Sequence, residues 1–93
     1  MVATYETNLT ELLDDIKKML IAKHHDYGSG NLKKRGIVGI MTRLDDKMAR
    51  IDNLSQNQNS DKQPHVDETI SETFMDVAGY AIQAILLLEN KLD

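Results

Sequence analysis

The sequence has no cysteine and no tryptophan, and it has only one phenylalanine and one proline. The absence of cysteine excludes disulfides, thiolate zinc sites and a cysteine nucleophile. Aromatic residues make up only 4% of the chain, so aliphatic side chains and five methionines have to fill the interior, which favours helices over a sheet. With 93 residues, the chain has the length of one domain, residues 1–93, whose modest core a partner chain would enlarge.

Excess positive charge and long hydrophobic runs are also missing. The net charge of −4 argues against a general nucleic-acid-binding protein, because such proteins usually present a basic face. The longest apolar run, residues 84–88, is too short to span a bilayer, and the first residues lack the pattern of a signal peptide. We therefore expect a soluble, cytoplasmic protein that has no membrane partner.

Three stretches carry apolar residues at helical spacing. The first follows Asn8, which has Glu11 three residues later in the spacing of a capping box. The polar stretch before the third contains the only proline and predicts a flexible loop. The expected fold is all-α, a three-helix antiparallel bundle completed by oligomerisation, with helices at about 9–24, 37–54 and 67–92 and the loop at 55–66.

The C-terminal half of the third predicted helix begins with a segment that is apolar on almost every side. From Ala81 to Leu88 only Gln83 is polar, and a helix that is apolar all round is a buried helix. Three helices from one chain hardly cover it. We therefore expect a homo-oligomer, most simply a dimer, that associates through residues 81–92.

Carboxylates recur at every turn along one side of the same predicted helix, at Glu68, Glu72 and Asp76. Like charges at this spacing repel, so the stripe is either tolerated in water or holds something positive. Carboxylates without cysteine or a spaced histidine pair suit Mg²⁺, or else Mn²⁺, together with substrate phosphates. Spacing alone leaves open a solvated acidic surface.

A second charged stripe lies beside the apolar seam of the predicted helix 37–54, and its members are Arg43, Asp46, Lys47 and Arg50. Cations at the edge of a groove between helices could neutralise phosphates. They could equally form structural salt bridges, and the pattern does not decide between these roles.

Two glycines interrupt the polar segment 23–31, which we expect to be a loop. Gly28 and Gly30 could allow the backbone to approach a ligand, or could simply provide a turn after a helix.

Three blocks of the sequence, KHHDYG with Asn31, GIMTRLDDKMARIDNL and DETISETFMDVAGYAIQAI, resemble a phage and bacterial family described as the nucleotide modification associated domain, a domain of unknown function. They occur in the family's order and span about residues 20–85. More distantly, the chain is similar to all-α nucleoside triphosphate pyrophosphohydrolases of the MazG and dUTPase kind, which bind Mg²⁺ with acidic residues on packed helices. It departs from the MazG pattern in one respect, because Asp45 and Asp46 are followed by Lys47 where a second carboxylate cluster is expected.

The resemblance implies roles for matching positions. It implies nucleotide binding by Asp26, Tyr27, Gly28, Asn31, Arg43, Asp46, Lys47, Arg50 and Tyr80. It implies metal binding by Glu68, Glu72 and Asp76, with Glu68 or Glu72 as the catalytic base.

The function implied is that of a phage-type, Mg²⁺-dependent nucleotide pyrophosphohydrolase that converts a (d)NTP to monophosphate and pyrophosphate, in the host cytoplasm if a phage encodes it. The alternative is a non-catalytic anti-defence protein that sequesters a nucleotide signal or inhibits a host defence protein. A purely structural dimer with a solvated acidic stripe is a third possibility.

Overall fold

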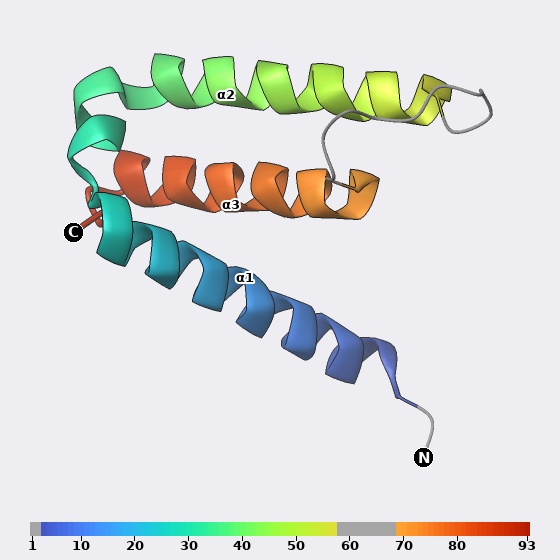
Figure 1. Cartoon of the computed structure of the whole chain (residues 1–93). Helices are drawn as coiled ribbons and strands as arrows, with labels where there is room; N and C mark the ends of the chain where they lie inside the picture. Colours follow the sequence, from blue (N-terminus) through green and yellow to red (C-terminus); the bar gives the residue numbers. More distant parts are fainter. Residues whose placement is uncertain (1–2, 58–68) are drawn as a thin grey trace.

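The computed structural model describes residues 3–57 and 69–93, and these form three helices without a strand (Figure 1). The helices are α1 (Tyr5–Tyr27), α2 (Gly30–Asn57) and α3 (Ile70–Leu88). Helix α2 runs antiparallel to α3, and α1 runs in the same general direction as α3 but diverges from it (Figure 1). The predicted all-α fold class is confirmed.

Helix α1 is longer than the predicted span of 9–24 at both ends. It begins at Tyr5 because the Thr4 side chain accepts a hydrogen bond from the Thr7 N–H, at 3.1 Å, as an N-cap. The capping box predicted at Asn8 is therefore wrong, since Asn8 already lies within the helix. The helix ends at Tyr27, so most of the predicted loop 23–31 is helical and only Gly28 and Ser29 connect α1 to α2.

Helix α2 contains a break at Gly36, where φ is 67° and ψ is −161°. A side chain rarely adopts this positive φ, so glycine permits the change of direction seen at the start of α2 (Figure 1). The predicted start of a helix at residue 37 coincides with the end of this break. Lys33, Lys34 and Arg35 lie in the short helical part before the break.

Helix α3 is shorter than the predicted span of 67–92. Thr69 is its N-cap, since the Thr69 Oγ1 accepts a hydrogen bond from the Glu72 N–H at 3.0 Å. At the other end Asn90 adopts a φ of 57°, and the N–H groups of Asn90 and Lys91 donate to the carbonyls of Leu87 and Leu86. This is a Schellman motif, which ends the helix before Leu92.

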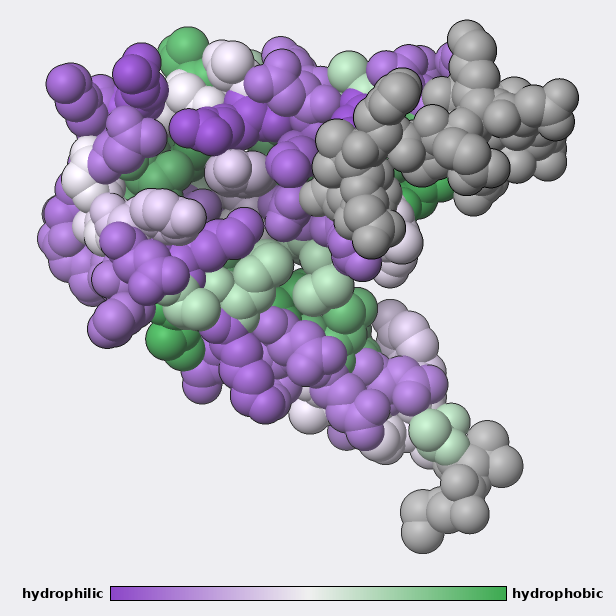
Figure 2. Space-filling view, viewed as in Figure 1, coloured by the Kyte–Doolittle hydropathy of each residue, from purple (hydrophilic) through white to green (hydrophobic). Residues whose placement is uncertain are grey.

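The core is small and lies mainly between α2 and α3. Ile40 and Ile51 of α2 are buried, as is Thr73 of α3, whose hydroxyl donates to the Thr69 carbonyl at 2.9 Å. Ile16 is the buried residue of α1, whose N-terminal half diverges from α3 and leaves an apolar-lined wedge between the two helices (Figures 1 and 2). The radius of gyration is 15.5 Å, against about 12 Å for a compact domain of this length, which reflects an open arrangement.

Candidate functional site

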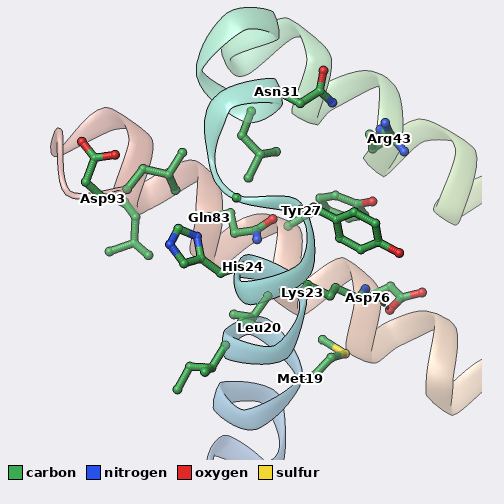
Figure 3. A pocket seen from close by; sticks show the side chains of 17 residues that line it. Met19, Leu20, Lys23, His24, Tyr27, Asn31, Arg43, Asp76, Gln83 and Asp93 are labelled. Carbon is green, nitrogen blue, oxygen red and sulfur yellow. Dashed lines mark ion pairs between the residues drawn. The ribbon is translucent and has the colours of Figure 1, made fainter.

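A cleft of about 830 Å³ lies where the C-terminal half of α1 meets α2, α3 and the residues after α3. This volume is within the usual range for small-molecule sites. The cleft has apolar walls and a group of polar side chains that converge on it from separate segments (Figure 3). The polar lining consists of Lys23, His24, Tyr27, Asn31, Arg43, Asp76, Tyr80, Gln83 and Asp93, and the apolar lining includes Met19, Leu20, Ile21, Leu32, Leu86 and Leu92.

The close approach of α1 to α3 depends on Gly79, which is buried in the middle of α3. A Cβ atom at this position would lie 3.1 Å from Leu20 Cδ2 and 3.2 Å from Met19 Cε. These distances are a few tenths of an ångström shorter than normal van der Waals contact, so a side chain at this position would require the ends of Leu20 and Met19 to shift. Gly79 thus sets the spacing between two walls of the cleft.

The turn between α1 and α2 brings two polar positions to the same cleft. Gly28 has a φ of 68°, and its N–H donates to the His24 carbonyl at 2.8 Å, which closes the end of α1. A Cβ atom at this position would have no neighbour within 4 Å, so the backbone angle and not space requires glycine here. The reversal places Tyr27 of α1 and Asn31 of α2 on one cavity.

Asp76 forms ion pairs with lysines from both neighbouring helices. Its Oδ2 lies 2.9 Å from the Lys47 Nζ of α2, and its Oδ1 lies 3.5 Å from the Lys23 Nζ of α1. Figure 3 shows Lys23 and Asp76 side by side at the cleft. The Asp76 side chain is only 17% exposed, so solvent screens these pairs less than it screens pairs on the surface. One carboxylate thereby fixes two ammonium groups that are 24 residues apart in the sequence.

The segment after α3 folds back to the turn between α1 and α2. The Asp93 carboxylate accepts hydrogen bonds from the Ser29 hydroxyl, at 3.3 Å, and from the Lys33 ammonium group. The Lys33 hydrogen bond and charge lower the pKa of Asp93 below its ordinary value. Leu92 is buried beside this contact and lines the cleft. Residues 89–92, predicted to build the oligomer, therefore lie outside α3, and Leu92 packs within its own chain.

Two carboxylates of the predicted metal site, Glu72 and Asp76, lie among the described residues. Residues 3–57 and 69–93 contain no group of three histidine or acidic side chains placed to hold a metal ion. Glu72 and Asp76 are one turn apart on α3, and Mg²⁺ typically uses one or two carboxylates with phosphate oxygens and water. In this structure each Asp76 oxygen lies beside a lysine, and the Glu72 side chain is exposed.

The predicted site residues divide into two groups. Tyr27, Gly28, Asn31, Arg43, Asp76 and Tyr80 line the cleft. Lys47 does not line the cleft but forms an ion pair with Asp76, which does, and Arg50 is half-buried on α2. The side chains of Asp26, Asp46 and Glu72 are exposed, and Asp26 pairs with His25 at 3.3 Å. Glu68 lies outside the described residues, as does the predicted loop from residue 58 onward.

Several cleft residues were missed by the sequence analysis, above all Lys23, His24, Gln83 and Asp93. Lys23 and Tyr27 have i,i+4 spacing, so they lie on one face once the segment 23–27 is recognised as helical. Gln83 is the one polar residue in the apolar part of α3, which is a usable signal for a residue that faces a cavity. No local signal identifies Asp93.

Comparison with known proteins gives one match. The family model described as nucleotide modification associated domain 1 matches residues 23–88, which is more than half of the chain and confirms the resemblance to that family. No curated protein and no solved structure matches the chain. The matched segment includes every helical residue that lines the cleft except Met19, Leu20 and Ile21.

Proposed function

Because the chain belongs to the nucleotide modification associated domain 1 family, we propose that the cleft binds a nucleotide. The observation that supports this best is that Lys23 and Arg43 line one apolar-walled cleft with two tyrosines, while Lys47 pairs with the cleft residue Asp76. The lysines and the arginine bind phosphate oxygens, since charge-assisted hydrogen bonds are the strong ones. The tyrosines, Tyr27 and Tyr80, offer faces on which a base stacks.

In the free protein Asp76 serves as the counter-ion of the two lysines. A phosphate group offers the same ammonium groups several oxygens and more negative charge, so it replaces the carboxylate as their partner. Asp76 is then released for other contacts. The amides of Asn31 and Gln83 line the same cleft and can hydrogen-bond the base or the sugar.

The proposal extends to hydrolysis of a nucleoside triphosphate, and its support is the resemblance to all-α pyrophosphohydrolases. Water attacks the α-phosphorus, the bond to the oxygen that bridges to the β-phosphorus breaks, and monophosphate and pyrophosphate form. Glu72 or Glu68 accepts the water proton, and the cations of the cleft stabilise the departing pyrophosphate. Mg²⁺, or Mn²⁺, would be held by Asp76, Glu72 and Glu68, and when bound it supplies charge neutralisation at the phosphates.

Binding and hydrolysis are tested separately. Calorimetry with each (d)NTP in the absence of metal measures binding, and we expect Lys47→Met to weaken it by about tenfold or more, the loss of one charged hydrogen bond. The matched control is Lys18→Met, because Lys18 pairs with Asp14 on the exposed side of α1 and lies away from the cleft. Equal affinity in wild type and Lys47→Met would contradict the assigned phosphate contact.

Chromatography of reaction products with Mg²⁺ tests the hydrolysis. We expect monophosphate and pyrophosphate from at least one nucleotide, and loss of product in Asp76→Ala. Full turnover in Asp76→Ala, or no turnover with any nucleotide, would refute the catalytic part and leave the binding part to the calorimetry.

A second candidate is a protein that sequesters a nucleotide without chemistry. It is favoured by the two ion pairs of Asp76, which occupy both carboxylate oxygens with lysines in the free protein. Tight binding without product, together with tighter metal-free binding in Asp76→Asn because a negative charge has left the cleft, would support sequestration over hydrolysis.

A further inference from the structure

Helix α3 presents a third face that no part of the described chain covers. Residues Phe74, Ala78, Ala81, Ile85 and Leu88 recur at steps of four and three and so form one stripe. Thr73 faces α2, and Asp76, Gly79 and Gln83 line the side toward α1 and the cleft. The stripe therefore lies on the side of α3 away from the cleft.

Helix α2 extends the same surface. Met41 and Met48 flank the buried Ile40 on the side opposite Arg43, which lines the cleft. On each helix these residues lie on the side opposite the residues that line the cleft, so the methionines and the α3 stripe lie on one side of the helix pair. We call Met41, Met48, Phe74, Ile85 and Leu88 the outer face, and their exposure ranges from 49% to 73%.

We propose that the outer face binds the outer face of a second copy of this chain, so that a symmetric dimer carries its two clefts on opposite sides. Taking about 200 Å² for a large apolar side chain, the five residues expose on the order of 500 Å². Two such faces remove about 1,000 Å² from water, which reaches the lower limit of a specific protein interface. The two alanines of the stripe allow a second helix to approach closely.

The surface suits a copy of itself in charge as well as in area. Between Thr73 and Leu88 the one charged residue is Asp76, and it points toward the cleft. On α3, a two-fold axis through the outer face therefore buries no charge, and the exposed Asp45 and Asp52 of α2 lie at the border of the face. The four-and-three spacing is also the repeat that lets paired helices interlock their side chains.

A lipid bilayer is the competing occupant. By length and composition α3 could cross a membrane, although a core helix of a soluble protein passes the same test. The outer face, however, is bordered on α2 by the exposed Asp45 and Asp52, and the chain has a net charge of −4. Membrane-facing surfaces are usually bordered by basic residues that attract anionic lipids, so this acidic border disfavours a bilayer.

Sedimentation equilibrium of the full chain from low micromolar to about 100 µM concentration tests the proposal, and we expect a dimer. In Ile85→Glu the dissociation constant should rise by at least about a hundredfold, because the symmetry introduces the charge twice. Ile85 is exposed in the single chain, so circular dichroism and nucleotide affinity should stay unchanged.

The matched control is Ile21→Glu, since Ile21 is exposed to a similar degree, 57% against 54%, but lies on α1. Because Ile21 lines the cleft, only the oligomeric state of this variant is compared. It should remain dimeric. A monomeric wild type at 100 µM, a dimer that persists in Ile85→Glu, dissociation in Ile21→Glu, or wild type that co-sediments with vesicles containing phosphatidylserine would each overturn the proposal. None of these outcomes depends on whether the cleft binds a nucleotide.

Discussion

Replacement of Asp76 by asparagine should destabilise the fold measurably, although the two side chains have nearly the same shape. The amide cannot neutralise Lys23 and Lys47, whose ammonium groups lie 3.5 and 2.9 Å from the carboxylate oxygens. Exposed ion pairs contribute about 0–1 kcal/mol, and removing one partner of a buried pair costs about 3–5 kcal/mol. Asp76 is 17% exposed and Lys47 26%, which places this pair nearer the buried limit, whereas Lys23 is 47% exposed and contributes less.

We therefore expect Asp76→Asn to lower the free energy of unfolding by about 2 kcal/mol, a value between the exposed and buried limits. For a domain of this size that corresponds to a fall of about 8–16 °C in the thermal midpoint. Urea titration followed by circular dichroism, at a fixed protein concentration, measures the change.

The matched control is Asp14→Asn. Asp14 pairs with Lys18 at 3.0 Å, but both side chains are more than half exposed, so its loss should cost much less than the loss of Asp76. If Asp76→Asn cost no more than Asp14→Asn, or stabilised the protein, the inference that Asp76 holds the three helices together through its lysines would be refuted.

Three further predictions concern the frame of the cleft. Gly79→Val should lower the free energy of unfolding by about 1–3 kcal/mol through overpacking against two α1 side chains, as measured by urea titration; an unchanged midpoint would contradict the close approach. Thr69→Ala removes the N-cap of α3 and should lower the free energy of unfolding by about 1 kcal/mol, whereas Thr69→Ser should leave it nearly unchanged. Equal losses of stability in the two variants would argue against the capping role of Thr69. The pKa of the Asp93 carboxyl, measured by NMR, should lie below 3.8 and should return toward 3.8 in Lys33→Ala. Because the pKa is lowered in the folded protein, the stabilising contact with Lys33 is fully present above pH 3.8 and is lost as the pH falls through the lowered pKa.

The sequence pattern predicted the number and approximate place of the helices because apolar periodicity is a local property. The helix predicted at 37–54 from apolar residues at helical spacing coincides with the longer part of α2. The helix ends were less predictable, since they depend on which of several polar residues caps the helix. Asparagine and threonine are both common N-cap residues, so Asn8 and Thr4 are both candidates. In the structure the Thr4 side chain makes the capping hydrogen bond with the Thr7 N–H.

The candidate site was predicted only in part. Tyr27, Asn31, Arg43 and Tyr80 were named from motifs and line one cleft, whereas Lys23 and Asp93 were missed. Their proximity depends on the turn at Gly28 and on the return of the chain after α3, which no periodicity encodes.

By itself the sequence determined an all-helical chain without cysteine chemistry, with two charged stripes and one helix whose apolar surface exceeds what three helices cover. Only the tertiary structure decided what the acidic stripe contacts. Glu72 and Asp76 both belong to the acidic stripe and both carry a carboxylate, yet Glu72 is exposed, whereas Asp76 lies between two lysines. The reason is that α1 approaches α3 closely at Gly79, which lies one turn after Asp76 on α3. Lysines from α1 and α2 therefore reach Asp76 and not Glu72, which lies one turn earlier.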